Sequence, residues 1–343
     1  MNDIKTKITQ TIQKRHGIRA FEIATVLGFS RQYVHKFLQE LKEEGKIVLI
    51  GKTNRAKYVI ADHELVADVK RMITDLRRVF INRDISEDII LDLIKRETGI
   101  FLDIPENVAR IVEYAFVEMT NNAIEHSQSA SVEVWFKRVR EHIRFDVIDH
   151  GVGIFYHLMQ KKGLKNELEA VQDLLKGKQT TDPERHTGEG IFFTSKVADA
   201  LTIKSFRKKI TFNNLINDIF IQDISNKDGT RVTFVISTNS QKKLEDTFSE
   251  YSSNSYEFDK TIVTVRFYKM GSIYISRSQA RRIMTGLEKF RSIVLDFDQI
   301  KTIGQAFADE IFRVWQHHHP DIRITHEHSN ENIEFMIKRA MIV

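Results

Sequence analysis

The chain has 343 residues, of which 41% are hydrophobic, and it contains no cysteine. This length predicts two or three domains with sizeable cores, and the lack of cysteine excludes a disulfide framework and any thiolate site. The first residues lack the apolar core of a signal peptide, and no apolar run approaches the roughly 20 residues that span a bilayer. We therefore expect a cytoplasmic protein with no membrane partner.

The formal net charge of +5 is unevenly distributed along the chain. Residues 1–62 carry twelve Lys and Arg against six Asp and Glu, so this segment has a charge of +6 and the remainder has −1. A local excess of basic residues is expected where a segment meets a polyanion. The charge pattern therefore favours contact with nucleic acid through the N-terminal segment alone.

The N-terminal segment shows three helical patterns followed by a hairpin. The first begins near Ile8, a second short helix stops at Gly28, and Ser30 is placed as the N-cap of a third. Two short strands, 46–50 and 57–61, then flank a turn. This order resembles a winged helix-turn-helix, and the resemblance implies double-stranded DNA as a partner.

In a winged helix, polar residues early on the third helix face the major groove and basic residues on the wing reach phosphates. The candidate DNA-binding residues are Arg31, Gln32, His35, Lys36, Lys52 and Arg55. The alternative is a winged helix used for protein contacts, with these charges merely solvated.

The segment 62–99 is predicted to be mostly helical, and Pro105 is typical of the first turn of a further helix. Along that helix an apolar stripe runs from Val108 to Ala123, and Glu118 and Asn122 lie at its edge. A polar pair in this position can border a pocket while the apolar stripe anchors the helix.

Two alternating strands, 132–136 and 143–147, follow, and the second runs into DHGVG. Here Asp149 could accept a hydrogen bond from an exocyclic amine, and Gly151 and Gly153 would let the backbone approach a ring. Gly188 and Gly190 precede another helical run, where free N–H groups could hold phosphate.

The order of four segments carries more information than any one of them: EMTNNA (118–123), DHGVG (149–153), HTGEGI (186–191) and DGTRVTF (228–234). Over residues 108–237 this series resembles the motifs of the GHKL ATPases, which include gyrase, heat-shock chaperones, histidine kinases and mismatch-repair ATPases. The resemblance implies an ATP pocket on an α/β sandwich, with a lid over residues 156–187.

By this resemblance, Asn122 corresponds to the Mg²⁺-binding asparagine and Glu118 to the catalytic acid that activates a water or a hydroxyl. The residues implied to bind ATP are Asn122, Asp149, Gly151, Gly153, Thr187, Gly188, Gly190 and Thr230. Two positions depart from the family pattern: His150 stands where a second acid or an asparagine is frequent, and Glu189 brings a negative charge near the phosphates.

Residues 238–260 are polar and Ser-rich and are predicted to form a linker. Strands and helices alternate again from residue 261: strands are expected near 261–267 and 272–276, and Ser276 is placed as a helix N-cap with Gln279 three positions on. The segment VLDFDQIKTIGQAFADEIF (294–312) lies at the centre of this part. This part resembles the STAS fold of anti-sigma-factor antagonists, in which a serine at the start of the central helix is phosphorylated. Gly304 and Gln305 occupy that place without a hydroxyl, so the resemblance implies a domain that docks on a protein partner or senses a signal.

We therefore predict a multidomain α+β protein: a winged helix (1–62), an α/β sandwich of the GHKL type (63–237), a linker (238–260) and an α/β STAS-like domain (261–343). The function expected first is an ATP- and DNA-binding regulator, acting as a homodimer, with ATP hydrolysis left open. The alternatives are a serine/threonine protein kinase of the anti-sigma-factor type and a DNA-sensing ATPase of a defence or mobile-element system. The segment before Val108 lacks the long helical hairpin that a histidine kinase uses for its phosphoacceptor.

Overall fold

The computed structural model describes residues 2–51, 56–177, 189–252, 258–268, 274 and 276–342. The chain divides into two compact units, and each is built from separated stretches of sequence. The first comprises 1–151, 198–203 and 229–241, and the second comprises 152–197, 204–228 and 242–343. Among the described residues, no helix combines the length and the apolar character that a membrane crossing needs.

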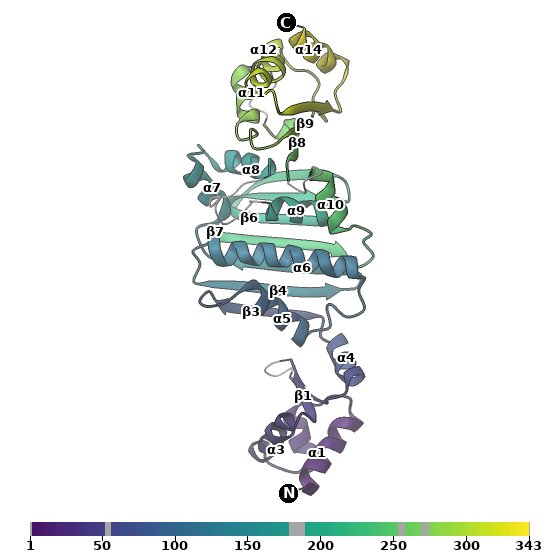
Figure 1. Cartoon of the computed structure of the whole chain (residues 1–343). Coiled ribbons are helices and arrows are strands. Elements are labelled where there is room, and N and C mark those ends of the chain that lie inside the picture. The colour runs from purple at the N-terminus through teal and green to yellow at the C-terminus, as the bar shows by residue number, and fades with distance from the viewer. Residues whose placement is uncertain are drawn as a thin grey trace. The chain divides into compact units, whose positions relative to one another are not determined.

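The N-terminal part has the predicted order of elements, which are α1 (Asn2–Lys14), α2 (Ala20–Leu27), α3 (Arg31–Glu43), β1 (Ile47–Ile50) and β2 (Lys57–Ile60) (Figure 1). Gly28 ends α2 with φ of 72°, and the Ser30 hydroxyl accepts from the N–H of Tyr33 at 3.2 Å, as an N-cap does. Ile18 bridges Tyr58, so a third backbone segment joins the hairpin.

Residues 62–99 differ from the prediction because they contain a strand. The segment forms α4 (His63–Arg71), β3 (Asp75–Ile81) and α5 (Glu87–Glu97). Only Leu76 of β3 is buried, while Val79 and Ile81 are 61% and 76% exposed. An edge strand with one buried residue gives little alternation of apolar and polar residues, and this accounts for the missed strand in a segment that is otherwise mainly helical, as predicted.

A five-stranded sheet has the order β3-β4-β5-β7-β6, with β4 (Ser131–Val139), β5 (His142–Asp149), β6 (Ala200–Asn213) and β7 (Asp218–Ser237). Helix α6 (Glu106–Asn121) lies along this sheet (Figure 1). The predicted stripe of α6 is buried, and the Phe116 ring packs 5.3 Å from that of Phe136 and 5.4 Å from that of Phe145. These contacts anchor α6, so its polar edge keeps a fixed position on the sheet.

The second unit contains α7 (Ile154–Lys162), α8 (Glu167–Leu175), α9 (Gly190–Val197) and α10 (Leu244–Tyr251). Helix α10 lies inside the predicted linker 238–260. It is held by aromatic contacts: the Phe248 ring lies 4.2 Å from Phe193, and the Tyr251 ring lies 4.9 Å from Phe192. These aromatic contacts pack α10 against α9, which the polar sequence around them did not predict.

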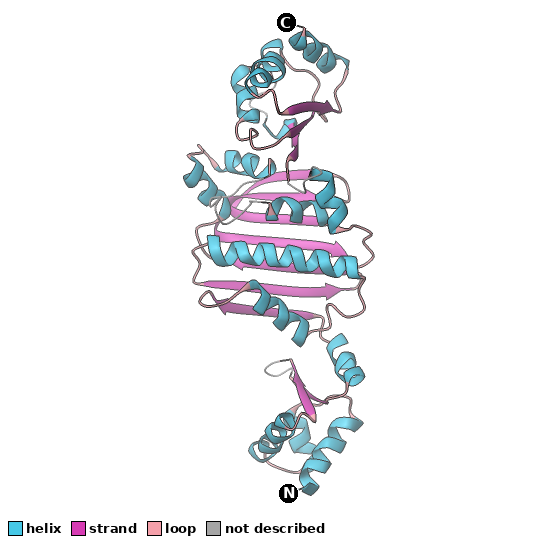
Figure 2. Ribbon diagram, in the orientation of Figure 1, coloured by secondary structure: helices cyan, strands magenta, loops and turns pink. Residues whose placement is uncertain are grey.

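The C-terminal part combines helices and strands (Figure 2). Its sheet has the order β10-β9-β8, with parallel pairs. Its elements are β8 (Lys260–Thr264), a 3₁₀ turn (Val265–Tyr268), α11 (Arg277–Met284), β9 (Ser292–Asp296), α12 (Gln305–Asp309), a π turn (Glu310–Trp315), α13 (Gln316–His318), β10 (Arg323–Glu327) and α14 (Glu331–Met341). The capping box of Ser276 and Gln279 is present, as predicted. In the strand predicted near 272–276, Tyr274 bridges Ile303.

Candidate functional site

Asp149, the last residue of β5, is a buried carboxylate that is 5% exposed. Its Oδ1 accepts hydrogen bonds from the backbone N–H of Gly151 at 3.0 Å and of Thr230 at 3.2 Å. Burial raises the pKa of the Asp149 carboxyl, although these donors and the Thr230 side chain oppose the rise. The structure thus brings together Asp149, Gly151 and Thr230, which the sequence placed in one pocket.

The turn after Asp149 is attached to the loop that follows α6. The Ser129 hydroxyl accepts from the N–H of His150 at 3.1 Å, and the Ser127 hydroxyl accepts from the N–H of Ser129 at 3.0 Å. A Cβ on Gly151 would lie 1.8 Å from the Ser127 carbonyl oxygen. Gly151 is therefore needed for the approach of two backbones, whereas the sequence had suggested an approach to a ring.

Gly229 is a site residue that the sequence analysis missed, although it lies inside the quoted DGTRVTF segment. Its φ is +72°, and a Cβ there would lie 2.0 Å from the carbonyl oxygen of Asp149. The glycine lets β7 reach the end of β5, which places the Thr230 N–H on the carboxylate. The Gly-Thr pair in that segment was the available signal.

Glu118 and Asn122 are both partly buried and lie one helical turn apart. Helix α6 changes at this point: residues Asn122–His126 form a π turn, and the Asn122 N–H donates to the carbonyls of Glu118 and Met119. Such turns are rare and frequently occur at functional sites. The change of helix type coincides with the segment that the sequence analysis singled out.

Two further glycines that were predicted to contact the nucleotide lie at the starts of helices. Gly153, with φ of +77°, stands at the N-cap of α7, and Gly190 is the first residue of α9. Both belong to the second unit. Thr187 and Gly188 lie outside the described residues, as do Lys52 and Arg55 of the predicted DNA-binding set.

The predicted lid, 156–187, contains most of α7 and all of α8, and hydrogen bonds join α8 and its C-cap Lys176 to the C-terminal layer. The ammonium of Lys176, whose side chain is almost fully buried, donates to the carbonyls of Arg282 at 3.0 Å and Thr285 at 2.7 Å. The Tyr268 hydroxyl donates to the carbonyl of Gln172 at 2.6 Å. Burial lowers the pKa of Lys176 to about 8. The sequence had indicated only a polar lid here.

On α3 the polar residues Arg31, Gln32, His35 and Lys36 are all exposed, while Val34, Phe37, Leu38 and Leu41 are buried. Acidic residues at the C-terminal end of this helix are engaged in ion pairs. Lys5 of α1 pairs with Glu40 at 2.7 Å and with Glu44 at 2.6 Å. Helix α3 therefore presents a polar and mostly basic surface at its N-terminal end.

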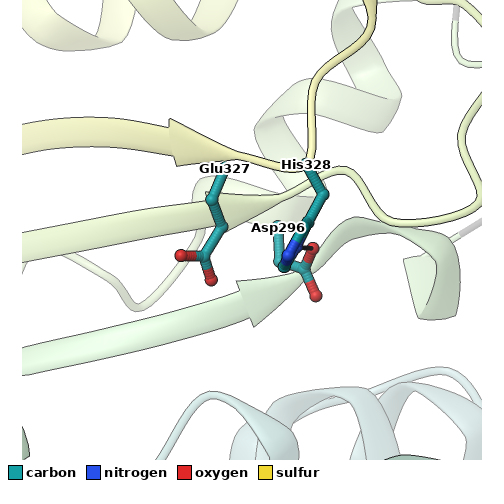
Figure 3. A group of neighbouring side chains, drawn as sticks. All are labelled: Asp296, Glu327 and His328. Atoms are coloured by element: carbon teal, nitrogen blue, oxygen red, sulfur yellow. Dashed lines mark hydrogen bonds and ion pairs between the residues drawn. The ribbon is translucent and has the colours of Figure 1, made fainter.

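Asp296, Glu327 and His328 lie together at the carboxyl ends of β9 and β10 (Figure 3). Each can offer one ligand atom, and these atoms lie within 4.8 Å of one another. His328 Nδ1 lies 2.8 Å from Asp296 Oδ1, and this contact raises the pKa of the imidazole. An ion pair between the imidazolium and the carboxylate accounts for the cluster without a metal ion.

Comparison with protein families yields two matches. Residues 61–213 match the model described as a histidine kinase-like ATPase domain, and residues 279–334 match the model of a STAS-like domain of unknown function. No curated protein matches the chain. The chain thus carries an ATPase domain of the histidine-kinase-like type, which implies nucleotide binding, followed by a STAS-like domain.

Proposed function

We propose that this protein is a regulator that binds ATP and DNA, in which the ATPase domain couples an N-terminal winged helix to the STAS-like domain. The observation that carries the nucleotide part is the Asp149 carboxylate, which is buried at a strand end and oriented by two backbone N–H groups. A desolvated acceptor of this kind suits the exocyclic amine of adenine.

The other residues of the site have roles that fit a bound Mg²⁺-ATP. Asn122 would coordinate Mg²⁺ through its side-chain oxygen, as hard cations prefer. Glu118, one turn earlier on α6, would accept the proton of an attacking water or hydroxyl. Thr187, Gly188 and Gly190 would contact phosphates at the start of α9. ATP supplies the transferable phosphoryl group, while the chain binds and orients it.

The DNA part of the proposal is supported by the order of α1, α2, α3 and the hairpin, by the exposed polar residues early on α3, and by the charge of +6 on residues 1–62. Arg31, Gln32, His35 and Lys36 would enter the major groove, and Lys52 and Arg55 would contact phosphates. A symmetric homodimer would present two α3 helices to two half-sites.

The coupling part is supported by the hydrogen bonds from α8 to the STAS-like domain. Because α8 lies in the predicted lid, a change of the lid on nucleotide binding would be transmitted through Lys176 to the STAS-like domain. Gln305, at the start of α12, provides no hydroxyl, so this contact would respond to lid position without phosphoryl transfer to the domain.

The test follows labelled phosphate from ATP and measures DNA affinity in parallel. Label released to water, together with DNA affinities that differ between ATP, ADP and no nucleotide, is the expected result. Equal DNA affinity in all three states would overturn the proposal that ATP regulates DNA binding. Label transferred to a separate protein would instead favour a serine/threonine kinase of the anti-sigma-factor type.

A further inference from the structure

A cavity of about 50 Å³ lies inside the second unit, where the ATPase domain meets the STAS-like domain. Its walls come from α8, α9, the β6–β7 pair and β8, and they are mainly apolar, with Leu174, Phe192 and Ile262 as examples. One water needs about 10–15 Å³ measured in this way, so the cavity has room for an acid of about four to six non-hydrogen atoms.

Among the described residues that line this cavity, the one ammonium group is that of Lys196 on α9. Its Nζ lies 5.3 Å from the ring centre of Phe192 and 5.2 Å from that of Tyr251. Burial lowers the pKa of Lys196, and the charge of Glu250 offsets this only in part. Lys196 is only partly buried, and the two aromatic rings attract its ammonium. An anion in the cavity would add a counter-charge and offset the remaining cost of desolvation.

We propose that this cavity binds a short-chain carboxylate, whose hydrocarbon part packs against Leu174, Phe192 and Ile262 while its carboxylate pairs with Lys196. An anion provides the counter-charge that the site needs, and a charge-assisted hydrogen bond is about twice as strong as a neutral one. A neutral amide of the same shape lacks that charge, and a cation would be repelled by Lys196.

The position of the cavity gives such a ligand a regulatory effect. Its walls include α9, which begins at Gly190, and β8 of the STAS-like domain, so one small molecule would contact both domains. The binding itself depends on neither ATP nor DNA. It can therefore fail while the proposed function holds, and the reverse is also true.

The experiment measures the thermal midpoint of the full chain in sodium butyrate, in butyramide, and in sodium chloride at matched ionic strength. Butyrate should raise the midpoint in a saturable way, and the other two should not. In Lys196→Met the dissociation constant for butyrate should increase at least tenfold, whereas Lys243→Met, which changes an exposed lysine, should retain the response.

No butyrate response in the unmodified chain would overturn the proposal, and so would an equal response to butyramide or in Lys196→Met. Because Met introduces no charge to desolvate, the Lys196→Met fold is expected to persist. If it does not fold, Ile262→Phe, which fills the cavity and keeps Lys196, takes its place. This variant should lose the response to butyrate, and a retained response would equally overturn the proposal.

Discussion

At the scale of single residues, Asp149 carries most of the functional argument, because a carboxylate that is only 5% exposed is retained at a cost in solvation. The Gly151 and Thr230 N–H groups reduce that cost and fix the direction of the carboxylate. In this arrangement the carboxylate has a fixed direction at the end of β5 and is largely hidden from water.

Asp149→Asn should weaken ATP binding tenfold or more. The amide replaces one of the two carboxylate oxygens with a donor and carries no charge, and losing a charged hydrogen bond costs about 1.5–3 kcal/mol. Calorimetric titration with ATP measures this loss. Asp146→Asn is the matched control, because Asp146 is also buried on β5 but pairs with Arg144 and Arg231. Unchanged ATP affinity in Asp149→Asn would remove Asp149 from the site.

The raised pKa of Asp149 predicts a pH dependence of ATP affinity. By the proposed role, the ionised carboxylate would accept from the adenine amine, so affinity should fall as pH drops through the folded pKa, which lies above the ordinary value of 3.8. The free protein should change in the opposite sense, gaining stability over the same interval, because burying the neutral acid costs less. Affinity and unfolding measured from pH 7 to pH 4 test both, with Asp149→Asn as the variant in which the effect is absent.

Substitutions of Glu118 and Asn122 should impair different steps, turnover in the first case and Mg²⁺-dependent ATP binding in the second. Glu118→Gln should keep Mg²⁺-ATP binding and lose turnover, since a general base acts in the transition state. Asn122→Ala should lose the Mg²⁺-dependent part of ATP affinity. Binding with and without Mg²⁺, together with phosphate release, separates the two. Equal losses of binding in both variants would show that the roles are assigned wrongly.

At the scale of elements, the junction of β5 and β7 depends on a turn that only glycine fits. Gly229→Ala should destabilise the fold and reduce ATP affinity, because the new methyl group would meet the Asp149 carbonyl at 2.0 Å. Gly163→Ala is the control: it also has positive φ, of +63°, but no atom lies within 4 Å of its Cβ position. The control should show only the backbone cost, on the order of 1 kcal/mol. Denaturant unfolding and ATP titration of both variants make the comparison.

Helix α3 should determine the sequence preference of DNA binding, and Lys52 and Arg55, predicted on the wing, should contribute to its salt dependence. Each phosphate contact adds about 0.9 to the slope of log affinity against log salt, so Lys52→Ala with Arg55→Ala should flatten that slope. Gln32→Ala should change sequence preference and leave the slope unchanged. A slope near zero in the unmodified protein would make this segment a protein-contact module.

The sequence predicted elements well where local chemistry determines them. Ser30 and the Ser276–Gln279 pair are caps that need only their own neighbours, and the α6 stripe needs only helical spacing. It failed where long-range packing decides. Strand β3 is stabilised by pairing with β4, and α10 is stabilised by ring contacts with Phe192 and Phe193. A glycine is needed at 229 because the carbonyl of Asp149, 80 positions earlier, lies against it.

At the scale of the whole molecule, the contact between α8 and the STAS-like domain should link ATP and DNA binding. Lys176→Met removes two hydrogen bonds to carbonyls and leaves these acceptors buried, at a cost of about 1–3 kcal/mol. We expect the ratio of DNA affinities in ATP and in ADP to move toward one in this variant. By linkage, the effect of DNA on ATP affinity should shrink equally.

Fluorescence anisotropy with labelled DNA measures this ratio. Lys165→Met is the matched control, because Lys165 is an exposed lysine of the same predicted lid. A ratio that is unchanged in Lys176→Met, or reduced equally in both variants, would show that the contact between α8 and the STAS-like domain does not couple ATP binding to DNA binding.

The bond between Thr261 and the Lys176 carbonyl joins residues 85 positions apart. A ribosome adds about 5–20 residues per second, so helix α8 emerges roughly 4–17 s before the strand that covers it. A helix forms in about a microsecond, which leaves the buried face of α8 uncovered for most of that time. Premature termination before residue 260 would make this state permanent, and such truncated chains should aggregate.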